Sequence, residues 1–207
     1  MKIKLLLLGV LILILASCGS SQRVGKTGAA KSARQLVTLS DEQQRKYDYF
    51  FLEATRLKGK KEYDAAFDLL KHCLTINPQA ASALYEISQY YMFLKQVPQG
   101  QAALEEAVES APDNYWYSQA LASLYQQQNE KEKAIGLLET MATRFPGKRE
   151  SLFALLDLYN QQEDYGKVIG TLDRLEEIMG KNEQLTMEKF RIYLQMKDDK
   201  SAFREIE

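Results

Sequence analysis

Cysteine and histidine are scarce in this chain of 207 residues, which contains two cysteines and one histidine. Cys73 has no predicted disulfide partner, and its place in a helical pattern predicts a small buried apolar residue. His72 has no cluster of cysteines or carboxylates at the spacing of a metal site around it. Glycine-rich phosphate loops and nucleophile elbows are also missing. The sequence therefore predicts no catalytic residue, no metal site and no cofactor.

Long hydrophobic runs are confined to the amino terminus. Residues 5–16 form an apolar run after Lys2 and Lys4, which is too short to span a bilayer and is typical of a secretory signal peptide. Residues 15–18 read LASC and resemble the lipobox of bacterial lipoproteins. The resemblance implies a signal peptide over residues 1–17 and a diacylglycerol-modified Cys18 as the first mature residue. The alternative is a plain signal peptide with a chance cysteine.

Charge is distributed unevenly along the chain, although the formal net charge is only −1. Residues 18–39 contain basic residues but no acid, and are rich in Gly, Ser and Ala, which predicts a flexible basic tether. This tether is compatible with contact to anionic headgroups and with a simple linker role. From Asp41 onward there are 21 basic and 28 acidic residues, a net charge of −7. This acidic balance argues against a nucleic-acid partner.

Proline is rare but regularly spaced. Pro78, Pro112 and Pro146 are 34 residues apart, and Gly180 follows after another 34. Within this period, apolar residues recur at spacings of three and four, which predicts helices. A fixed period of this length indicates stacked supersecondary units.

Residues of matching size occupy the same register in successive units. Large residues recur late in the first predicted helix, at Leu57, Tyr91, Tyr125, Tyr159 and Tyr193. Small residues recur where helices would cross, at Ala54, Ser88, Ala122, Ala66, Gly100, Ala134, Ala202, Cys73 and Ala107. Small side chains at a crossing let helix axes approach to about 8–10 Å. This set of positions resembles the tetratricopeptide repeat (TPR) family over essentially the whole chain after the tether.

The resemblance implies an all-α fold over residues 40–207: a right-handed superhelical solenoid of antiparallel helix pairs, with about four and a half TPR units. Ser40 and Gln43 match a capping box, which predicts that the first helix starts there. Gly180 replaces the closing proline and predicts a left-handed helix cap. The chain stops within the last helix of unit five, so the sequence predicts a truncated solenoid. The residues that would then face a missing neighbour are Phe190, Tyr193, Phe203 and Ile206.

In the TPR family, the first helix of each unit lines a concave face. Carried over position by position, this face comprises Phe51, Thr55, Lys58, Tyr85, Gln89, Met92, Phe93, Trp116, Gln119, Ser123, Gln126, Phe153, Asp157 and Asn160. Aromatic rings mixed with amides suit an extended peptide, which they hold by ring contact and backbone hydrogen bonds. The chaperone-binding branch of the TPR family clamps a peptide carboxylate with lysine and asparagine, and this clamp is missing here. The alternative for each ring is packing against a neighbouring helix.

Together these features predict a non-catalytic scaffold that is anchored to a bacterial membrane through Cys18 and binds a protein or peptide. Residues 19 and 20 are not the aspartate that retains enteric lipoproteins at the inner membrane. The outer membrane, facing the periplasm, is therefore favoured over the inner membrane and the cell surface. Two alternatives stay open: a lipid-anchored protein that captures glycans or nutrients, and the accessory region of a longer enzyme. No sequence feature indicates an oligomeric state.

Overall fold

The computed structural model describes residues 37–207, which form ten α-helices and no strand within that range. The predicted signal peptide over residues 1–17, Cys18 and nearly all of the tether over residues 18–39 lie outside the described residues. Those three assignments stay predictions. In the part of the chain that the structure describes, no helix has both the length and the apolar character needed to cross a membrane.

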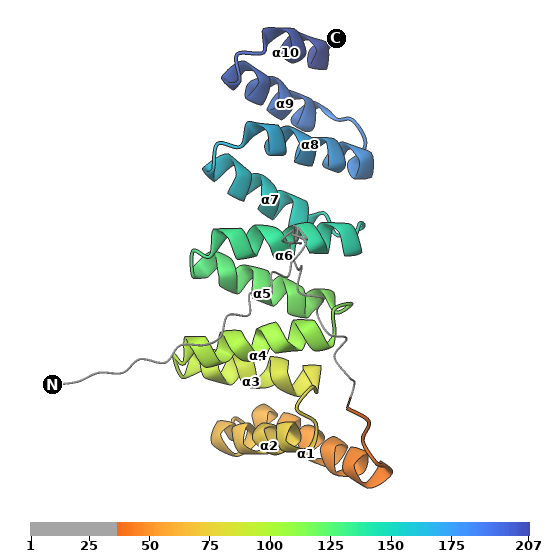
Figure 1. The fold of residues 1–207 in the computed structure, drawn as a ribbon, viewed down its shortest axis with the longest axis vertical. Coiled ribbons are helices and arrows are strands. Elements are labelled where there is room, and N and C mark those ends of the chain that lie inside the picture. Colours follow the sequence, from red (N-terminus) through yellow and green to blue (C-terminus); the bar gives the residue numbers. More distant parts are fainter. Residues whose placement is uncertain (1–36) are drawn as a thin grey trace, which may run out of the picture. The chain divides into compact units, whose positions relative to one another are not determined.

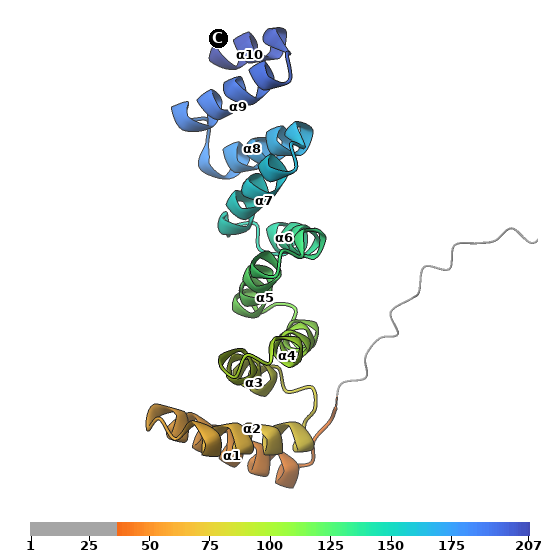
Figure 2. The same ribbon diagram turned by 90° about the vertical axis from the view of Figure 1, so that its left-hand side faces the viewer.

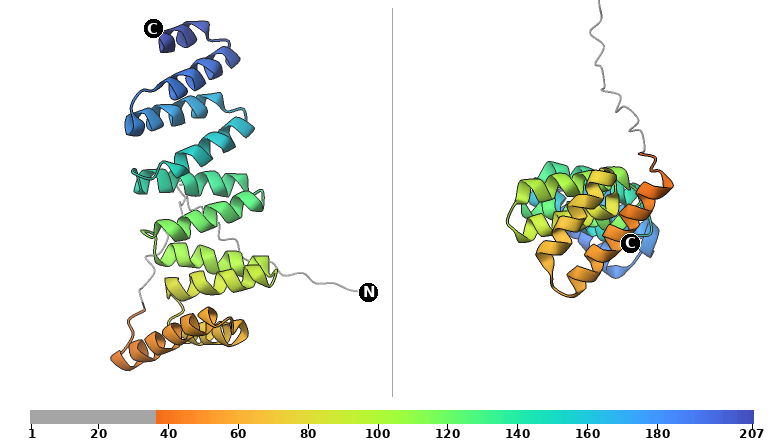
Figure 3. Two further views of the ribbon diagram at one scale, coloured as in Figure 1. Left: turned by 180° about the vertical axis from the view of Figure 1, so that it is seen from behind. Right: turned by 90° about the horizontal axis from the view of Figure 1, so that it is seen from below.

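The helices form five consecutive pairs. They are α1 (Asp41–Gly59) and α2 (Tyr63–Ile76), α3 (Ala81–Phe93) and α4 (Val97–Ser110), α5 (Tyr115–Gln127) and α6 (Lys131–Arg144), α7 (Glu150–Gln161) and α8 (Tyr165–Met179), and α9 (Glu183–Gln195) and α10 (Asp199–Ile206). Each helix packs against its neighbours in the sequence, and the pairs stack in chain order from α1 to α10 (Figure 1 and, from behind, Figure 3). The predicted all-α solenoid of antiparallel helix pairs is confirmed.

Side-chain caps define several helix starts. The Ser40 Oγ accepts a hydrogen bond from the Gln43 N–H at 3.3 Å, and the Gln43 Oε1 accepts one from the Ser40 N–H at 2.9 Å. This reciprocal pair confirms the predicted capping box. Later helices have an N-cap without the reciprocal bond. In these caps, a side-chain oxygen accepts a hydrogen bond from a backbone N–H of the first turn, as at Asn114, Asp164 and Asn182.

The ends of the units follow the predicted 34-residue period. Pro78, Pro112 and Pro146 each lie just beyond the second helix of their unit, where a proline cannot continue the helix. Gly180 directly follows α8 with φ 79° and ψ 157°. Its φ is positive but its ψ is extended, so the predicted left-handed helical cap is wrong in detail. Gly180 occupies the region of positive φ that is essentially restricted to glycine.

The small residues lie where the helices cross, as the register predicted. Ala66, Cys73, Ala107 and Ala134 are completely buried. A Cβ atom at Gly100 would lie 2.7 Å from the Met92 Cε, which shows how closely α4 approaches α3. Burial also raises the pKa of the Cys73 thiol to about 11.

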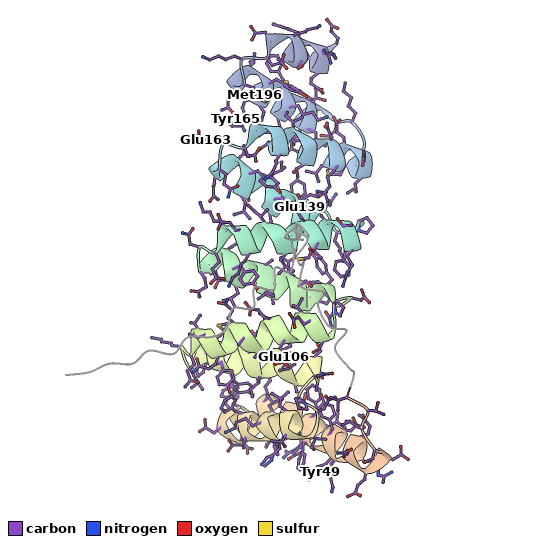
Figure 4. All side chains as sticks on the ribbon, in the orientation of Figure 1. Tyr49, Glu106, Glu139, Glu163, Tyr165 and Met196 are labelled. Carbon is purple, nitrogen blue, oxygen red and sulfur yellow. The ribbon has the colours of Figure 1, made fainter. Side chains whose placement is uncertain are left out.

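The turn inside each unit contains a left-handed residue that the sequence analysis did not predict. Lys61, Lys95, Asn129, Glu163 and Lys197 all have φ between 56° and 66°, and they too are 34 residues apart. Figure 4 labels Glu163, at the turn between α7 and α8. Of these residue types, asparagine is the one that tolerates this conformation best.

Two of the large-residue positions join successive units through hydrogen bonds. The Tyr125 Oη donates to the Glu105 Oε1 at 2.9 Å, and the Tyr159 Oη donates to the Glu139 Oε1 at 2.8 Å. Each glutamate comes from the second helix of the preceding unit, and Glu139 is labelled on α6 in Figure 4. These contacts therefore act between units and not only within them.

The last described unit contains a buried cation. Lys189 occupies the register of the buried Ile87, Leu121 and Leu155 and is only 3% exposed. Its Nζ lies 2.5 Å from a carboxylate oxygen of Asp173 and 2.5 Å from one of Glu176. Burial lowers the Lys189 pKa, but these two hydrogen bonds outweigh it, so the net shift is upward.

Four aromatic and aliphatic residues of α9 and α10 were predicted to face a missing neighbour. Phe203 and Ile206 are 55% and 49% exposed, whereas Phe190 and Tyr193 are half-buried. The Phe190 and Phe203 rings meet edge to face, with centroids 6.2 Å apart. The two helices thus cover part of each other's apolar surface.

Candidate functional site

The first helices α1, α3, α5 and α7 keep the side chains predicted for the concave face out of the core. We call the side chains predicted for the concave face the first-helix face: Phe51, Thr55, Lys58, Tyr85, Gln89, Met92, Phe93, Trp116, Gln119, Ser123, Gln126, Phe153, Asp157 and Asn160. None of them is buried, because residues three and four apart share one side of a helix while the opposite side packs on the core. From α3 to α6, Figure 2 shows the odd-numbered helices along one side of the stack and the even-numbered helices along the other.

Three large side chains of this face are exposed. Phe93, the last residue of α3, is 79% exposed, Trp116 in the first turn of α5 is 67% exposed, and Phe153 of α7 is 41% exposed. The Trp116 ring meets the Tyr115 ring edge to face at 5.3 Å, and the Lys148 Nζ lies 5.7 Å from its centre. These contacts orient the indole but leave most of it accessible.

Other aromatic members are partly used in packing between helices. Tyr85 of α3 stacks on Tyr117 of α5, with centroids 4.7 Å apart and an interplanar angle of 23°. Phe51 stacks on Tyr47 at 5.9 Å within α1. Met92 is half-buried over Gly100. These three side chains therefore offer less free surface than Phe93 or Trp116.

The polar side chains of the first-helix face differ in whether they already form hydrogen bonds within the protein. The Gln119 Oε1 accepts from the Tyr115 Oη at 2.7 Å, and the Gln89 Nε2 donates to the Ser88 Oγ at 3.2 Å. The side chains of Asp157, Asn160 and Ser123 make no hydrogen bond or ion pair with another residue of 37–207. Their donors and acceptors are available to a bound chain.

At α1, the face includes an ion pair between two units. The Lys58 Nζ lies 2.5 Å from the Glu86 Oε2 across α1 and α3. This hydrogen bond raises the pKa of Lys58. Because both side chains are partly exposed, the pair adds little to stability, but it fixes the charges at this end of the face.

A cleft opens beside this ion pair, at the junction of units one and two. Its volume is about 240 Å³, and its lining residues are Lys58, Tyr63, Gln89, Tyr90 and Phe93. Sequence analysis placed Lys58, Gln89 and Phe93 on the first-helix face but missed Tyr63 and Tyr90. Tyr63 opens α2 and was outside the predicted face, and Tyr90 lies on the packed side of α3. Only the docking of the two units brings them together.

Metal-ligating side chains do not converge in the described region. Within residues 37–207, no group of three His, Cys, Asp or Glu residues is placed to hold a metal ion. The His72 ring, on the exposed side of α2, stacks on Phe50 with centroids 5.7 Å apart. The first-helix face offers aromatic surface, amides and the side chains of Ser123 and Asp157.

Comparisons with known proteins agree with this architecture. Residues 57–124 match a sequence model of the tetratricopeptide repeat. No curated protein matches the chain. Among solved structures, MamA AMB-1 is 18% identical with a TM-score of 0.57, and the match covers 79% of this chain and 89% of that one. MamA from Desulfovibrio magneticus RS-1 is 14% identical with a TM-score of 0.54, covering 82% and 93%.

A third solved structure is YrrB, described as a TPR protein with an unusual peptide-binding site. It is 13% identical to this chain with a TM-score of 0.57, and the match covers 79% of this chain and 85% of YrrB. At these identities, the similarity shows the fold alone. The resemblance to the TPR family is therefore supported both by the matched repeat and by the solenoid architecture.

Proposed function

We propose that this TPR-type solenoid is a non-catalytic adaptor that binds a peptide or protein segment on its first-helix face. The observation that carries the proposal is the exposure of Phe93 and Trp116 on a face that also contains uncommitted polar side chains. Exposed rings of this size cost free energy in water and serve as anchors when a partner covers them. Nearby amides then bind the partner's backbone.

The proposal includes a lipid anchor. Its support is the sequence of residues 1–18, in which a short apolar run ends at LASC. An anchor on Cys18 followed by the tether of residues 18–39 would hold the solenoid at a bacterial membrane, with the outer membrane facing the periplasm as the favoured site. Two acyl chains bind a bilayer stably, whereas one binds only marginally.

The test of binding starts by capturing the partner through crosslinking in native membranes, with the full-length protein as bait. Affinity for the captured segment is then measured for Trp116→Ala. Trp116→Ala should weaken binding by about 2 kcal/mol or more, the size expected for an aromatic hot spot. Its thermal unfolding should stay close to that of the unmodified chain, because the ring is 67% exposed.

The matched control is Tyr125→Ala, which truncates a buried ring of the same helix. Tyr125 is 8% exposed, so the cavity should cost roughly 3–5 kcal/mol of unfolding free energy. Equal destabilisation by the two substitutions would place Trp116 in the core. Unchanged affinity in Trp116→Ala would place the partner on another surface.

The anchor has its own test. Cys18→Ala should abolish metabolic fatty-acid labelling and release the protein from the membrane fraction. A Cys18→Ala variant that still labels and still fractionates with membranes contradicts the lipid anchor, whatever the outcome for Trp116.

A further inference from the structure

The cleft at the junction of units one and two has the dimensions of a side-chain pocket. Its volume of about 240 Å³ lies below the roughly 300–1,000 Å³ typical of sites for drug-sized ligands. The rings of Tyr63, Tyr90 and Phe93 supply most of its lining, and the Tyr63 and Tyr90 rings meet edge to face at 6.4 Å. A wall of three rings favours an aromatic guest, because aromatic pairs gain from edge-to-face and offset contacts.

Tyr90 contributes its ring to the cleft and not its hydroxyl. The Tyr90 side chain is 8% exposed, and its Oη is shielded from solvent without a hydrogen bond to another residue of 37–207. A guest that enters from solvent does not reach this oxygen, so contact with the rings recognises the guest.

Lysines are frequent at the border of the cleft, although the solenoid as a whole is acidic. Glu86, a carboxylate beside the cleft, is paired with Lys58. Lys60 and Lys61 lie in the α1–α2 turn between the lining residues Lys58 and Tyr63, and the Lys61 N–H donates to the Lys58 carbonyl at 3.0 Å. Lys95 lies two residues beyond Phe93. None of these three lysines forms an ion pair with a residue of 37–207, and Glu62 is the one carboxylate of the α1–α2 turn.

We propose that this cleft receives an aromatic side chain from a partner segment in which the aromatic residue is flanked by carboxylates. The ring enters between Tyr63, Tyr90 and Phe93, and the flanking carboxylates meet Lys61 and Lys95. This inference rests on the proposed function, since it assigns the partner's chemistry at one end of the first-helix face. The lysines at the border also predict a salt-dependent affinity.

The probe is a fluorescein-labelled peptide of sequence GDEFDEG, titrated against the full-length protein in detergent by fluorescence anisotropy. Two comparison peptides separate the ring from the charge: GDEADEG lacks the ring, and GKKFKKG reverses the charges. Both should bind at least tenfold more weakly than GDEFDEG. Equal binding of either comparison peptide, or no saturable binding of GDEFDEG, overturns the proposal.

Protein variants then locate the binding. Phe93→Ala should weaken the binding of GDEFDEG at least tenfold without changing the unfolding transition, because Phe93 is 79% exposed. Lys95→Glu should weaken it and flatten its salt dependence. Lys197→Glu, at the same left-handed register in unit five, is the matched control and should have no effect. Glutamate fits this backbone, since Glu163 already occupies the register.

The two proposals fail in different ways. If the captured partner depends on Trp116 while GDEFDEG does not depend on Phe93, the cleft assignment is wrong and the adaptor function stands. If GDEFDEG binds through Phe93 while the affinity for the captured partner is unchanged in Trp116→Ala and Phe93→Ala, the cleft binds such peptides. The proposed function on this face is then wrong.

Discussion

Removing the hydroxyl of Tyr159 should measure how strongly successive units are joined. Tyr159→Phe keeps the buried ring and deletes only the 2.8 Å hydrogen bond from the Tyr159 Oη to the Glu139 carboxylate. A hydrogen bond to a charged group contributes about 1.5–3 kcal/mol. The Glu139 side chain is 40% exposed and keeps its 2.8 Å ion pair with Arg174, so water can replace part of the lost bond. We therefore expect the unfolding free energy to fall by about 1–2 kcal/mol.

The chain provides a matched control at the same register. Tyr91 occupies the position of Tyr159 in unit two, but Lys71 stands where the glutamate would be and pairs with Asp68 at 2.7 Å. Tyr91→Phe should therefore change the unfolding free energy by less than about 0.5 kcal/mol. Urea denaturation followed by circular dichroism measures both variants.

A double-mutant cycle with Glu139→Ala, which removes the acceptor, isolates the pair. If the hydrogen bond joins the units, the loss in the double variant should be smaller than the sum of the two single losses. Additive losses, or an equal loss in Tyr91→Phe, would refute the assignment.

The same bond predicts a pH dependence. Burial and the hydrogen bond to Glu139 raise the pKa of Tyr159 from 10.0 to about 12. The raised pKa means that the folded state favours the protonated phenol. This contribution to stability is complete below about pH 10 and is lost as the pH rises toward 12. The stability difference between the unmodified chain and Tyr159→Phe should shrink over that window.

Further substitutions test three features that the fold introduced. Gly180→Ala should cost about 1–3 kcal/mol of unfolding free energy, because φ 79° with ψ 157° is strained for any other residue, and an unchanged urea midpoint would contradict this. Glu163→Asn should stabilise the chain by about 0.5–1 kcal/mol and Asn129→Glu should destabilise it by a similar amount, since asparagine tolerates the left-handed turn better. Lys189→Met should cost about 3 kcal/mol by leaving Glu176 without its buried partner, and adding Glu176→Leu should restore most of that loss in urea unfolding.

The repeat and its helices were predictable because they depend on local chemistry. The spacing of Pro78, Pro112 and Pro146 and the periodicity of the apolar residues are properties of the chain itself. The capping box at Ser40 involves residues three apart, so no tertiary information is needed to find it. The solvent exposure of Trp116 and Phe93 likewise follows from their register on an amphipathic helix.

Contacts between units could not be predicted from the sequence. Lys189 has the register of a core residue, and a lysine there gives no sign of burial until α8 supplies Asp173 and Glu176. Tyr85 stacks on the ring of Tyr117, which the next first helix contributes. The bond from Tyr159 to Glu139 also crosses a unit boundary.

The sequence by itself determined the repeat, the start of the first helix, the ends of the units and the side of the first helices of units one to four that faces solvent. Each of these depends on residues within a turn or two of one another. The cleft at Tyr63 and Tyr90 was decided only by the tertiary structure. These two residues belong to different units, and the distance between their rings depends on how closely α2 and α3 approach. That approach is set by the sum of many packing contacts along the junction, and no periodicity in the sequence encodes it.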